Sequence, residues 1–263
     1  YGVNFASGGG GVLPQTYSGY AIDLKTQLSQ FKNVEKVLKE KLGDKETKKV
    51  FSRAVYLFNI GANDYIYALT VNRSVFQSYT KKEFVEEVIG SQIDVIKEIY
   101  KIGGRKFGLV GMGPLGCSPG VVVKNHEQNS REFSCDKRVT QLVKLHNQII
   151  STVLINLSCQ LQGLKYGIFD LYVSLRERIS HPLKYGFKDG KTACCGSGPF
   201  RGNYTCGKGE KYVVCENPNE RVFYDSYHPT QKAYQQLAEL MWNGTPSIIQ
   251  PYNLKTLFYL INL

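Results

Sequence analysis

Short runs of apolar residues alternate along this chain with longer stretches in which apolar side chains recur every three or four residues. The first long stretch, 22–42, has the spacing of an amphipathic helix and stops at Gly43. The run at 55–60 is almost entirely apolar, as expected of a strand buried on both faces of a sheet. Such alternation predicts an α/β fold with a mainly parallel sheet. Further helices are expected at 82–102, at 136–161 and from Pro229 onward, and further strands at KFGLVGM (106–112), YGIFDLY (166–172) and RVFY (221–224).

The composition fits a single globular domain over residues 1–263. Hydrophobic residues make up 42% of the chain and charged residues 21%, which is enough for a core and too little charge for disorder. No run reaches the roughly 18 apolar residues that a membrane-spanning helix needs. The net charge of +11 is spread over the amphipathic stretches, and no nucleic-acid-binding motif is present, so nucleic acid is not an expected partner. The Gly- and Cys-rich stretch 186–219 predicts a cross-linked loop region.

Cysteine usage points to an oxidising compartment. Seven cysteines, with Cys194 and Cys195 adjacent, are more than a reduced cytosolic protein usually carries. Zinc is the alternative, but the spacing to Cys206 and Cys215 does not match the paired C-x₂₋₄-C knuckles of structural zinc sites. We therefore predict disulfides and secretion; no secretion signal precedes Tyr1, so it has been removed or a longer segment is missing. N-glycosylation sequons agree with secretion and lie at Asn72, Asn156, Asn203 and Asn243.

Polar residues follow two of the predicted strands. Asn63 and Asp64 come after the run at 55–60, and Asp225 and His228 come after RVFY. Ligands of parallel sheets bind beyond the carboxyl ends of the strands, so we expect these groups to converge. An Asp that holds the Nδ1–H of a His lets Nε2 take a proton from a hydroxyl, which makes Asp225 the orienting group and His228 the base. In the alternative, Asp225 caps the following helix and His228 is an incidental turn residue.

Three further features bear on the chemistry. The amide of Asn63 and a backbone N–H of NFASGGGG (4–11) could stabilise an oxyanion, although Asn in a Gly-rich turn is often present for its backbone conformation. GMGPLG (111–116) formally matches a dinucleotide-binding pattern, but Pro114 and Pro119 interrupt the helix that such a site needs. SGGGG (7–11) could suggest a phosphate loop, but it lacks the Lys and Ser/Thr that a Walker A motif requires. No cofactor or metal is expected.

Several blocks together resemble the plant GDSL esterase/lipases of the SGNH hydrolase superfamily. The resemblance extends over nearly the whole chain and implies a three-layer α/β/α fold. It also implies hydrolysis of carboxylic esters by a Ser-His-Asp mechanism, on a small-molecule or lipid ester, in the apoplast or cell wall. The blocks are NFASGGGG, NIGANDY, GLVGMGPLGCSPG, CDKRVTQLVKLHNQI, ACCGSGPF with YTCG, and FYDSYHPT, in this order.

The resemblance assigns roles to four residues. The oxyanion hole corresponds to Asn63 and to one of the glycines 8–11, of which we choose Gly8. Asp225 and His228 correspond to the orienting acid and the base. The Gly-Asp-Ser-Leu block that carries the family's nucleophile is absent, since no Gly-Asp-Ser occurs in the sequence.

The absent block affects the expected fold and function. Its strand is an interior one in the family's sheet, so this chain is expected to lack the first strand. The chain is then a fragment of a longer protein, the partner of a separate cleaved chain, or a shortened product without catalysis, and we favour the first two together. The rival function is a non-catalytic protein that binds ligands or associates with another enzyme.

The resemblance also implies a disulfide pattern. Cys117 pairs with Cys135, and the adjacent Cys194 and Cys195 pair with Cys206 and Cys215. Cys159 is left over, either as a buried free thiol or as a bridge to the missing segment.

Overall fold

The protein is described by a computed structural model over residues 2–72, 74–125 and 132–260. The chain forms two compact units. Unit 1 consists of Tyr1–Val110, Leu145–Phe169 and Gln250–Leu263, and unit 2 of Gly111–Lys144 and Asp170–Ile249.

The central feature of unit 1 is a four-stranded sheet in the order β1-β2-β3-β6. Strands β1, β2 and β3 are parallel, and their register places Tyr56, Phe107 and Tyr166 in one row. Phe107 and Phe169 have no exposed surface, as expected of strands inside a parallel sheet. The strands are β1 (Val55–Phe58), β2 (Lys106–Val110), β3 (Lys165–Phe169) and β6 (Ile249–Pro251).

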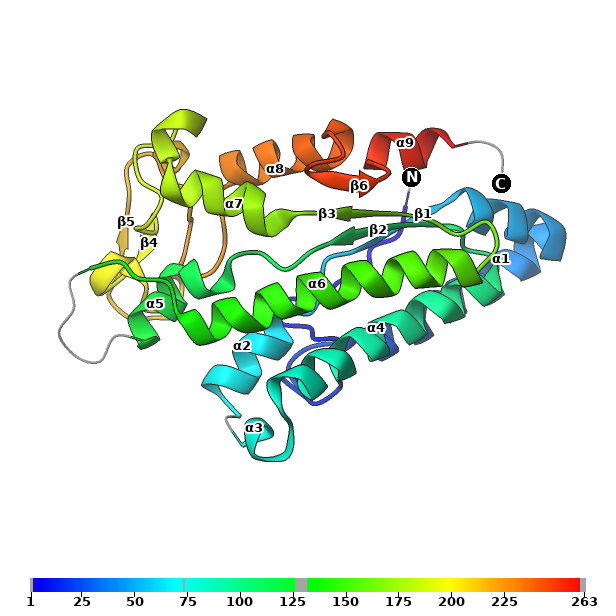
Figure 1. The fold of residues 1–263 in the computed structure, drawn as a ribbon, viewed down its shortest axis with the longest axis horizontal. Helices are drawn as coiled ribbons and strands as arrows, with labels where there is room; N and C mark the ends of the chain where they lie inside the picture. Colours follow the sequence, from blue (N-terminus) through cyan, green and yellow to red (C-terminus); the bar gives the residue numbers. More distant parts are fainter. Residues whose placement is uncertain (1, 73, 126–131, 261–263) are drawn as a thin grey trace. The chain divides into compact units, whose positions relative to one another are not determined.

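Helices cover both faces of this sheet. On one face, the Tyr56 ring stacks on Phe107 and meets the edge of Phe31 from α1. On the other face, Gly108 and Gly167 are register partners and leave room for the segment that contains α9; a Cβ atom at Gly108 would lie 2.8 Å from Leu254. The result is the expected three-layer α/β/α arrangement, in which α9 and α4 lie on opposite sides of the strands (Figure 1). The helices are α1 (Leu24–Arg53), α2 (Ala62–Thr70), α3 (Val75–Ser78), α4 (Lys81–Ile102) and α9 (Leu254–Tyr259), together with α6 (Lys137–Gln160) from Leu145 onward.

Local signals explain where the long helices of unit 1 begin and break. Helix α4 begins with a capping box, in which Thr80 Oγ1 accepts a hydrogen bond from the Glu83 N–H and the Glu83 carboxylate accepts one from the Thr80 N–H. Gly43 interrupts α1 with a φ of 76°, as the sequence predicts, but the chain then resumes a helix up to Arg53. Gly43 therefore interrupts the helix where the sequence predicts its end, but the helix does not end there.

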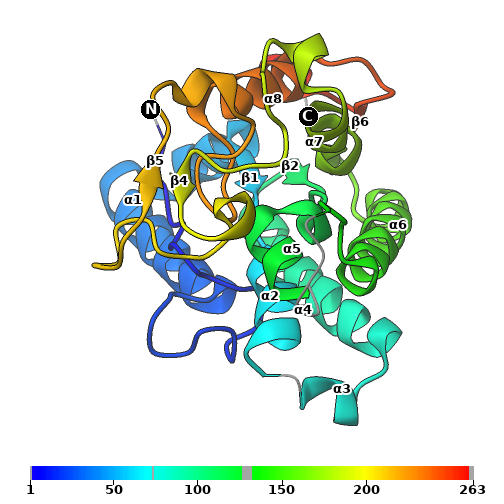
Figure 2. The ribbon, with the colours of Figure 1, turned by 90° about the vertical axis from the view of Figure 1, so that its left-hand side faces the viewer.

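Unit 2 is built from helices and a cross-linked loop region. Strands β4 (Cys195–Gly196) and β5 (Val213–Val214) form a small antiparallel pair within this loop region (Figure 2). The helices are α5 (Pro119–Asn125), α6 up to Lys144, α7 (Leu171–Ser180) and α8 (Gln231–Asn243), with 3₁₀ turns at Leu115–Cys117, Pro182–Tyr185, Pro199–Arg201 and Pro218–Glu220.

The disulfides confirm the predicted pattern and define it further. They join Cys117 to Cys135, Cys194 to Cys215 and Cys195 to Cys206. Cys159 is a free thiol, and it is exposed. The expectation of a buried free thiol is therefore wrong.

The prediction of a strand at RVFY (221–224) is also wrong. These residues make only isolated bridges, between Asp189 and Arg221 and between Phe223 and Pro229, and the fourth strand of the sheet is β6. The run is apolar because Val222 and Phe223 are buried within unit 2. Its backbone groups bond to the loop region and to the turn that follows, which leaves no ladder for a sheet partner.

Candidate active site

The turn after Phe223 brings Asp225 and His228 together. One carboxylate oxygen of Asp225 accepts hydrogen bonds from the backbone N–H groups of Tyr227 and His228, both at 2.8 Å. The Tyr224 N–H donates to the His228 carbonyl oxygen at 2.7 Å and closes the turn. This is the turn that an Asp side chain favours, because it accepts from N–H groups two and three residues on. Both carboxylate oxygens lie 2.9 Å from Nδ1 of His228.

The electrostatics of the pair favour an ionised Asp225. Burial alone would raise the pKa of Asp225, but hydrogen bonds from the His228 ring and from two backbone N–H groups bring it below its usual value. The hydrogen bond that the His228 ring donates to Asp225 raises the pKa of His228 above 6.5. The Asp225 side chain is 18% exposed and that of His228 is 61% exposed. With Nδ1 engaged, Nε2 has no hydrogen-bond partner among the described residues.

Close packing holds the turn from one side. The Ser226 hydroxyl donates to the Asn203 carbonyl oxygen at 3.1 Å, and the Ser226 carbonyl accepts from the Gly120 N–H at 2.7 Å. The Tyr227 ring covers Gly120 so closely that a Cβ atom there would lie 2.7 Å from the ring. Gly120 therefore permits the backbone approach that fixes Ser226, next to Asp225.

The cross-linked loop holds the turn from another side. The Cys194 N–H donates to the Phe223 carbonyl oxygen at 2.9 Å, and the Cys195 N–H donates to that of Tyr224 at 2.7 Å. Each of these two cysteines is also in a disulfide. The adjacent cysteines thus tie the loop to the two residues that precede Asp225.

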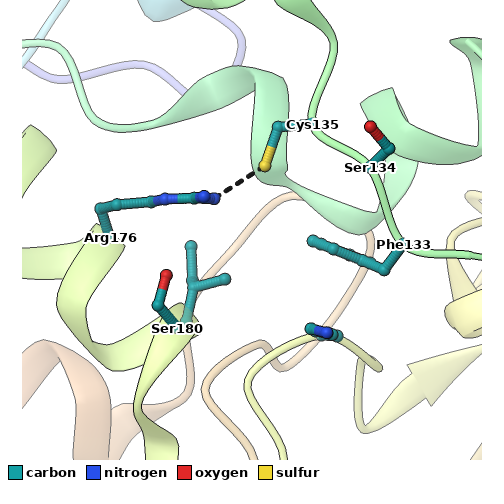
Figure 3. A pocket seen from close by; sticks show the side chains of 7 residues that line it. Phe133, Ser134, Cys135, Arg176 and Ser180 are labelled. Atoms are coloured by element: carbon teal, nitrogen blue, oxygen red, sulfur yellow. Dashed lines mark hydrogen bonds between the residues drawn. The ribbon is translucent and has the colours of Figure 1, made fainter.

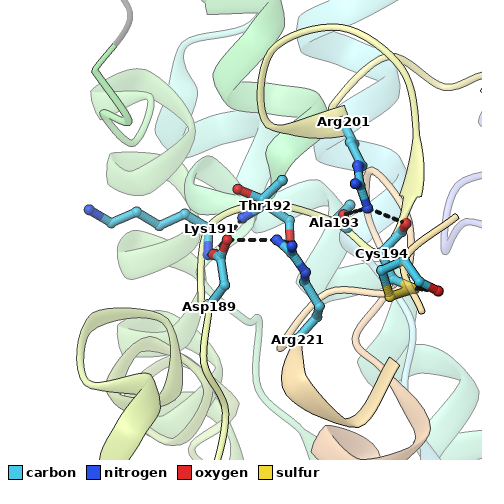
Figure 4. Close-up of polar contacts among 8 residues, drawn as sticks. Asp189, Lys191, Thr192, Ala193, Cys194, Arg201 and Arg221 are labelled. Carbon is cyan, nitrogen blue, oxygen red and sulfur yellow. Dashed lines mark hydrogen bonds and ion pairs between the residues drawn. A yellow bond between two sulfur atoms is a disulfide. The ribbon is translucent and has the colours of Figure 1, made fainter. Parts of the chain in front are cut away.

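An ion pair anchors the same chain segment at its start. Arg221 Nη1 lies 2.6 Å from a carboxylate oxygen of Asp189, and the other carboxylate oxygen accepts from the N–H groups of Lys191 and Thr192 (Figure 4). Arg221 and Asp189 are 24% and 31% exposed, so the pair is partly shielded from water.

In unit 1, the other predicted residues lie at the start of α2 and in the Gly-rich loop. Gly61 precedes the helix with a φ of 112°, which glycine adopts readily. Asn63 is half-buried, and its Nδ2 donates to the Gly10 carbonyl oxygen at 3.0 Å. Gly8 is exposed, and a Cβ atom added there would have no heavy atom within 4 Å apart from its chain neighbours.

The structure thus confirms one predicted contact and adds another. Asp225 and His228 meet in unit 2, and the alternative reading of Asp225 as a helix cap is wrong, because the N-cap of α8 is Thr230. Asn63 meets the Gly-rich loop in unit 1. The convergence of these two groups stays a prediction. It can no longer be argued from the ends of two parallel strands, because RVFY is not a strand.

A cavity of about 440 Å³ lies elsewhere in unit 2. Arg176 reaches into it and donates from Nη1 to the sulfur of Cys135 at 2.8 Å (Figure 3). None of the predicted site residues lines this cavity. Its lining residues are Phe133, Ser134, Cys135, Arg176, Ile179, Ser180 and Lys191.

Over the described residues, no three His, Cys, Asp or Glu side chains group as a metal ion would require. In that same part of the chain, no helix is long and apolar enough to cross a membrane.

Comparison with known proteins gives a consistent result. The family described as GDSL-like Lipase/Acylhydrolase matches residues 1–241. GDSL esterase/lipase 3 of Arabidopsis thaliana is 52% identical over 99% of this chain and 71% of its own length. A GDSL lipase of Tanacetum cinerariifolium is 43% identical over 98% of this chain and 67% of its own. Inactive GDSL esterase/lipase-like protein 25 of Arabidopsis thaliana is 35% identical over 99% of this chain and 58% of its own.

Proposed function

The chain belongs to the GDSL-like lipase/acylhydrolase family, and on this premise we propose that it hydrolyses carboxylic esters through an acyl-enzyme. The observation that carries the proposal is the contact of both Asp225 carboxylate oxygens with Nδ1 of His228 at 2.9 Å. A carboxylate in this position orients the imidazole and stabilises its protonated form. It leaves Nε2 to take the proton of an attacking hydroxyl and to return it to the leaving alcohol.

The nucleophile in this proposal is a serine outside residues 1–263, because no Gly-Asp-Ser occurs within them. Two of the relatives are longer than this chain, which spans 71% and 67% of them. One longer polypeptide would account for the serine without a separate chain. The substrate class is a small-molecule or lipid ester.

Asn63 and Gly8 are the proposed oxyanion donors. The Nδ2 of Asn63 carries two hydrogens, and the contact with Gly10 uses one of them, so one N–H remains for an oxyanion. Gly8 has no side chain to block access to its backbone N–H. A donor of this kind is typically worth about 10²–10³ in rate.

We also propose that the protein is secreted and glycosylated and acts in the apoplast or cell wall. Its three disulfides favour an oxidising compartment. Sequon asparagines Asn156, Asn203 and Asn243 are exposed and accessible to a glycan, whereas Asn72 is half-buried.

The rival function, that of a non-catalytic binding protein, gains no support from the turn that holds Asp225 and His228. A protein that only binds a ligand has no need of a carboxylate that fixes the tautomer of a histidine. The inactive relative shows that the rival deserves a direct test.

His228→Ala in the full-length protein provides this test. We expect kcat for p-nitrophenyl butyrate to fall about 10³–10⁴-fold, with circular dichroism and melting temperature close to wild type. The matched control is His181→Ala, since the side chains of His181 and His228 are similarly exposed, at 62% and 61%. Unchanged hydrolysis by a folded His228→Ala variant would reject the proposed function.

A further inference from the structure

Asp64 is a completely buried carboxylate whose hydrogen bonds leave its own helix. Its exposed fraction is 0%. One oxygen accepts from the Val12 N–H at 2.9 Å, and the other accepts from the Leu13 N–H at 2.9 Å and the Thr16 hydroxyl at 2.7 Å. All three donors belong to the segment that follows the Gly-rich loop, 48 to 52 residues earlier in the chain.

Burial of this carboxylate costs free energy of folding, which argues that the carboxylate serves a function. No cationic side chain pairs with Asp64 in the described part of the chain, and burial raises its pKa despite the hydrogen bonds. An acid in the first turn of a helix usually stabilises the N-terminus of that helix from the surface. Asp64 occupies such a position in α2, but its side chain is turned into the protein and both carboxylate oxygens bind the segment 12–16, which follows the loop.

The loop is shaped to receive this carboxylate. A Cβ atom at Gly11 would lie 2.7 Å from an Asp64 carboxylate oxygen and would collide with the Thr16 side chain. The neighbouring Asn63 holds the same loop one residue earlier, through the Gly10 carbonyl oxygen. Two adjacent residues of α2 therefore bind the end of the Gly-rich loop and the segment that follows it.

We propose that Asp64 is a positioning residue that fixes the Gly-rich loop and the Asn63 amide as a preformed pair of oxyanion donors. The inference rests on the proposed ester hydrolysis. The grip on Val12, Leu13 and Thr16 sets the path of the loop that bears Gly8, and the bond to Gly10 sets the direction of the Asn63 amide. Donors held in place before the reaction stabilise the transition state and contribute little to substrate binding.

The test uses Asp64→Asn in the full-length protein, with Asp136→Asn as the matched control. Asp136 is also a buried carboxylate, 3% exposed, that accepts from backbone N–H groups, those of Arg138 and Val139 in unit 2. We expect Asp64→Asn to lower kcat about 10²-fold with KM within about threefold of wild type, because an amide cannot accept from all three donors. Affinity for a trifluoromethyl ketone should fall by a similar factor, and Asp136→Asn should lose stability but keep kcat.

Hydrogen exchange separates this inference from the proposed function. The Val12 and Leu13 amides should be protected in the wild type and should exchange at least about tenfold faster in Asp64→Asn. If the wild type hydrolyses no ester, the proposed function fails, and with it the role of Asp64 in positioning the oxyanion donors, while the exchange data still decide whether Asp64 holds the segment 12–16. Equal kcat losses in both variants, a loss confined to KM, or unchanged exchange would overturn the inference. If Asp64→Asn does not fold, Thr16→Val removes one of the three donors, and we expect kcat to fall about three- to tenfold.

Discussion

The phenol oxygen of Tyr65 lies 2.6 Å from Nδ1 of His146, and the two residues are only 0% and 2% exposed. Their rings meet edge to face. Burial lowers the pKa of His146 to about 4 and raises that of Tyr65 well above its usual value, so both are neutral at pH 7. The neutral imidazole accepts the hydrogen bond of the phenol, which satisfies two buried polar groups with one contact.

The pH dependence of stability should reveal this histidine. Between pH 6.5 and about 4, the unfolded chain binds a proton at His146 that the folded chain does not. The free energy of unfolding should therefore be highest above pH 6.5 and fall as the pH decreases, by up to about 1.4 kcal/mol per pH unit from this residue. Urea unfolding at pH 7, 6 and 5 measures the slope.

His146→Gln is the control for this slope. Glutamine can accept from the Tyr65 hydroxyl but does not titrate, so the variant should be less stable at pH 7 by about 1–3 kcal/mol and should respond less to pH. An equal slope in the variant and the wild type would assign the titration to other groups.

Asp225→Asn should change both the rate and the pH profile of ester hydrolysis. Because the Asp225 contact raises the pKa of His228 above 6.5, kcat/KM of the wild type should fall as the pH drops through a value above 6.5. The variant should have its acid limb at lower pH, and its plateau should be about 10³–10⁴-fold lower, because an amide does not enforce the tautomer. A rate profile on p-nitrophenyl butyrate from pH 5 to 9 measures both. An acid limb that does not move would mean that His228 is not the titrating base.

The sequence predicted those parts of the fold that depend on long, regular patterns. The apolar runs at β1, β2 and β3 and the helical spacing of α4 and α6 are confirmed. The prediction of a strand at RVFY failed because these residues pack against the cross-linked loop, whose backbone bonds to Phe223 and Tyr224. An apolar run in the sequence does not reveal such a partner. Strand β6 was not predicted because it has only three residues and ends in Pro251.

The candidate site shows the same limit at the scale of single residues. The contact of Asp225 with His228 is set by their spacing of three and was predicted from it. The hydrogen bonds of Asp64 join residues 48 to 52 apart, which no local pattern displays. The signal that was present is the position of Asp64 next to Asn63, directly after a strand and a glycine.

The disulfides of the adjacent cysteines should stabilise the turn that brings Asp225 and His228 together. The double variant Cys195→Ser/Cys206→Ser opens a link between residues 11 apart, which typically costs about 2–4 kcal/mol. Because the Cys195 N–H bonds to the Tyr224 carbonyl oxygen, the loss should loosen the turn and lower kcat as well as the melting temperature. Cys159→Ser is the control, since this thiol is free and exposed, and it should leave both unchanged. A double variant with the stability and kcat of the wild type would show that the turn does not depend on the link.

The glycine pair in the sheet makes a further prediction about the layer formed by α9. A Cβ atom at Gly167 would collide with the Tyr252 carbonyl oxygen, and this backbone cannot move aside as a flexible side chain could. Gly167→Ala should therefore displace the segment that leads into α9 and lower the free energy of unfolding by about 1–3 kcal/mol or more. Gly90→Ala is the matched control, because Gly90 is an exposed glycine within α4 with no heavy atom within 4 Å of its Cβ position. It should stabilise the protein by about 0.5–1 kcal/mol. Urea unfolding of the two variants should give shifts of opposite sign, and equal shifts would mean that α9 does not pack on the sheet as described.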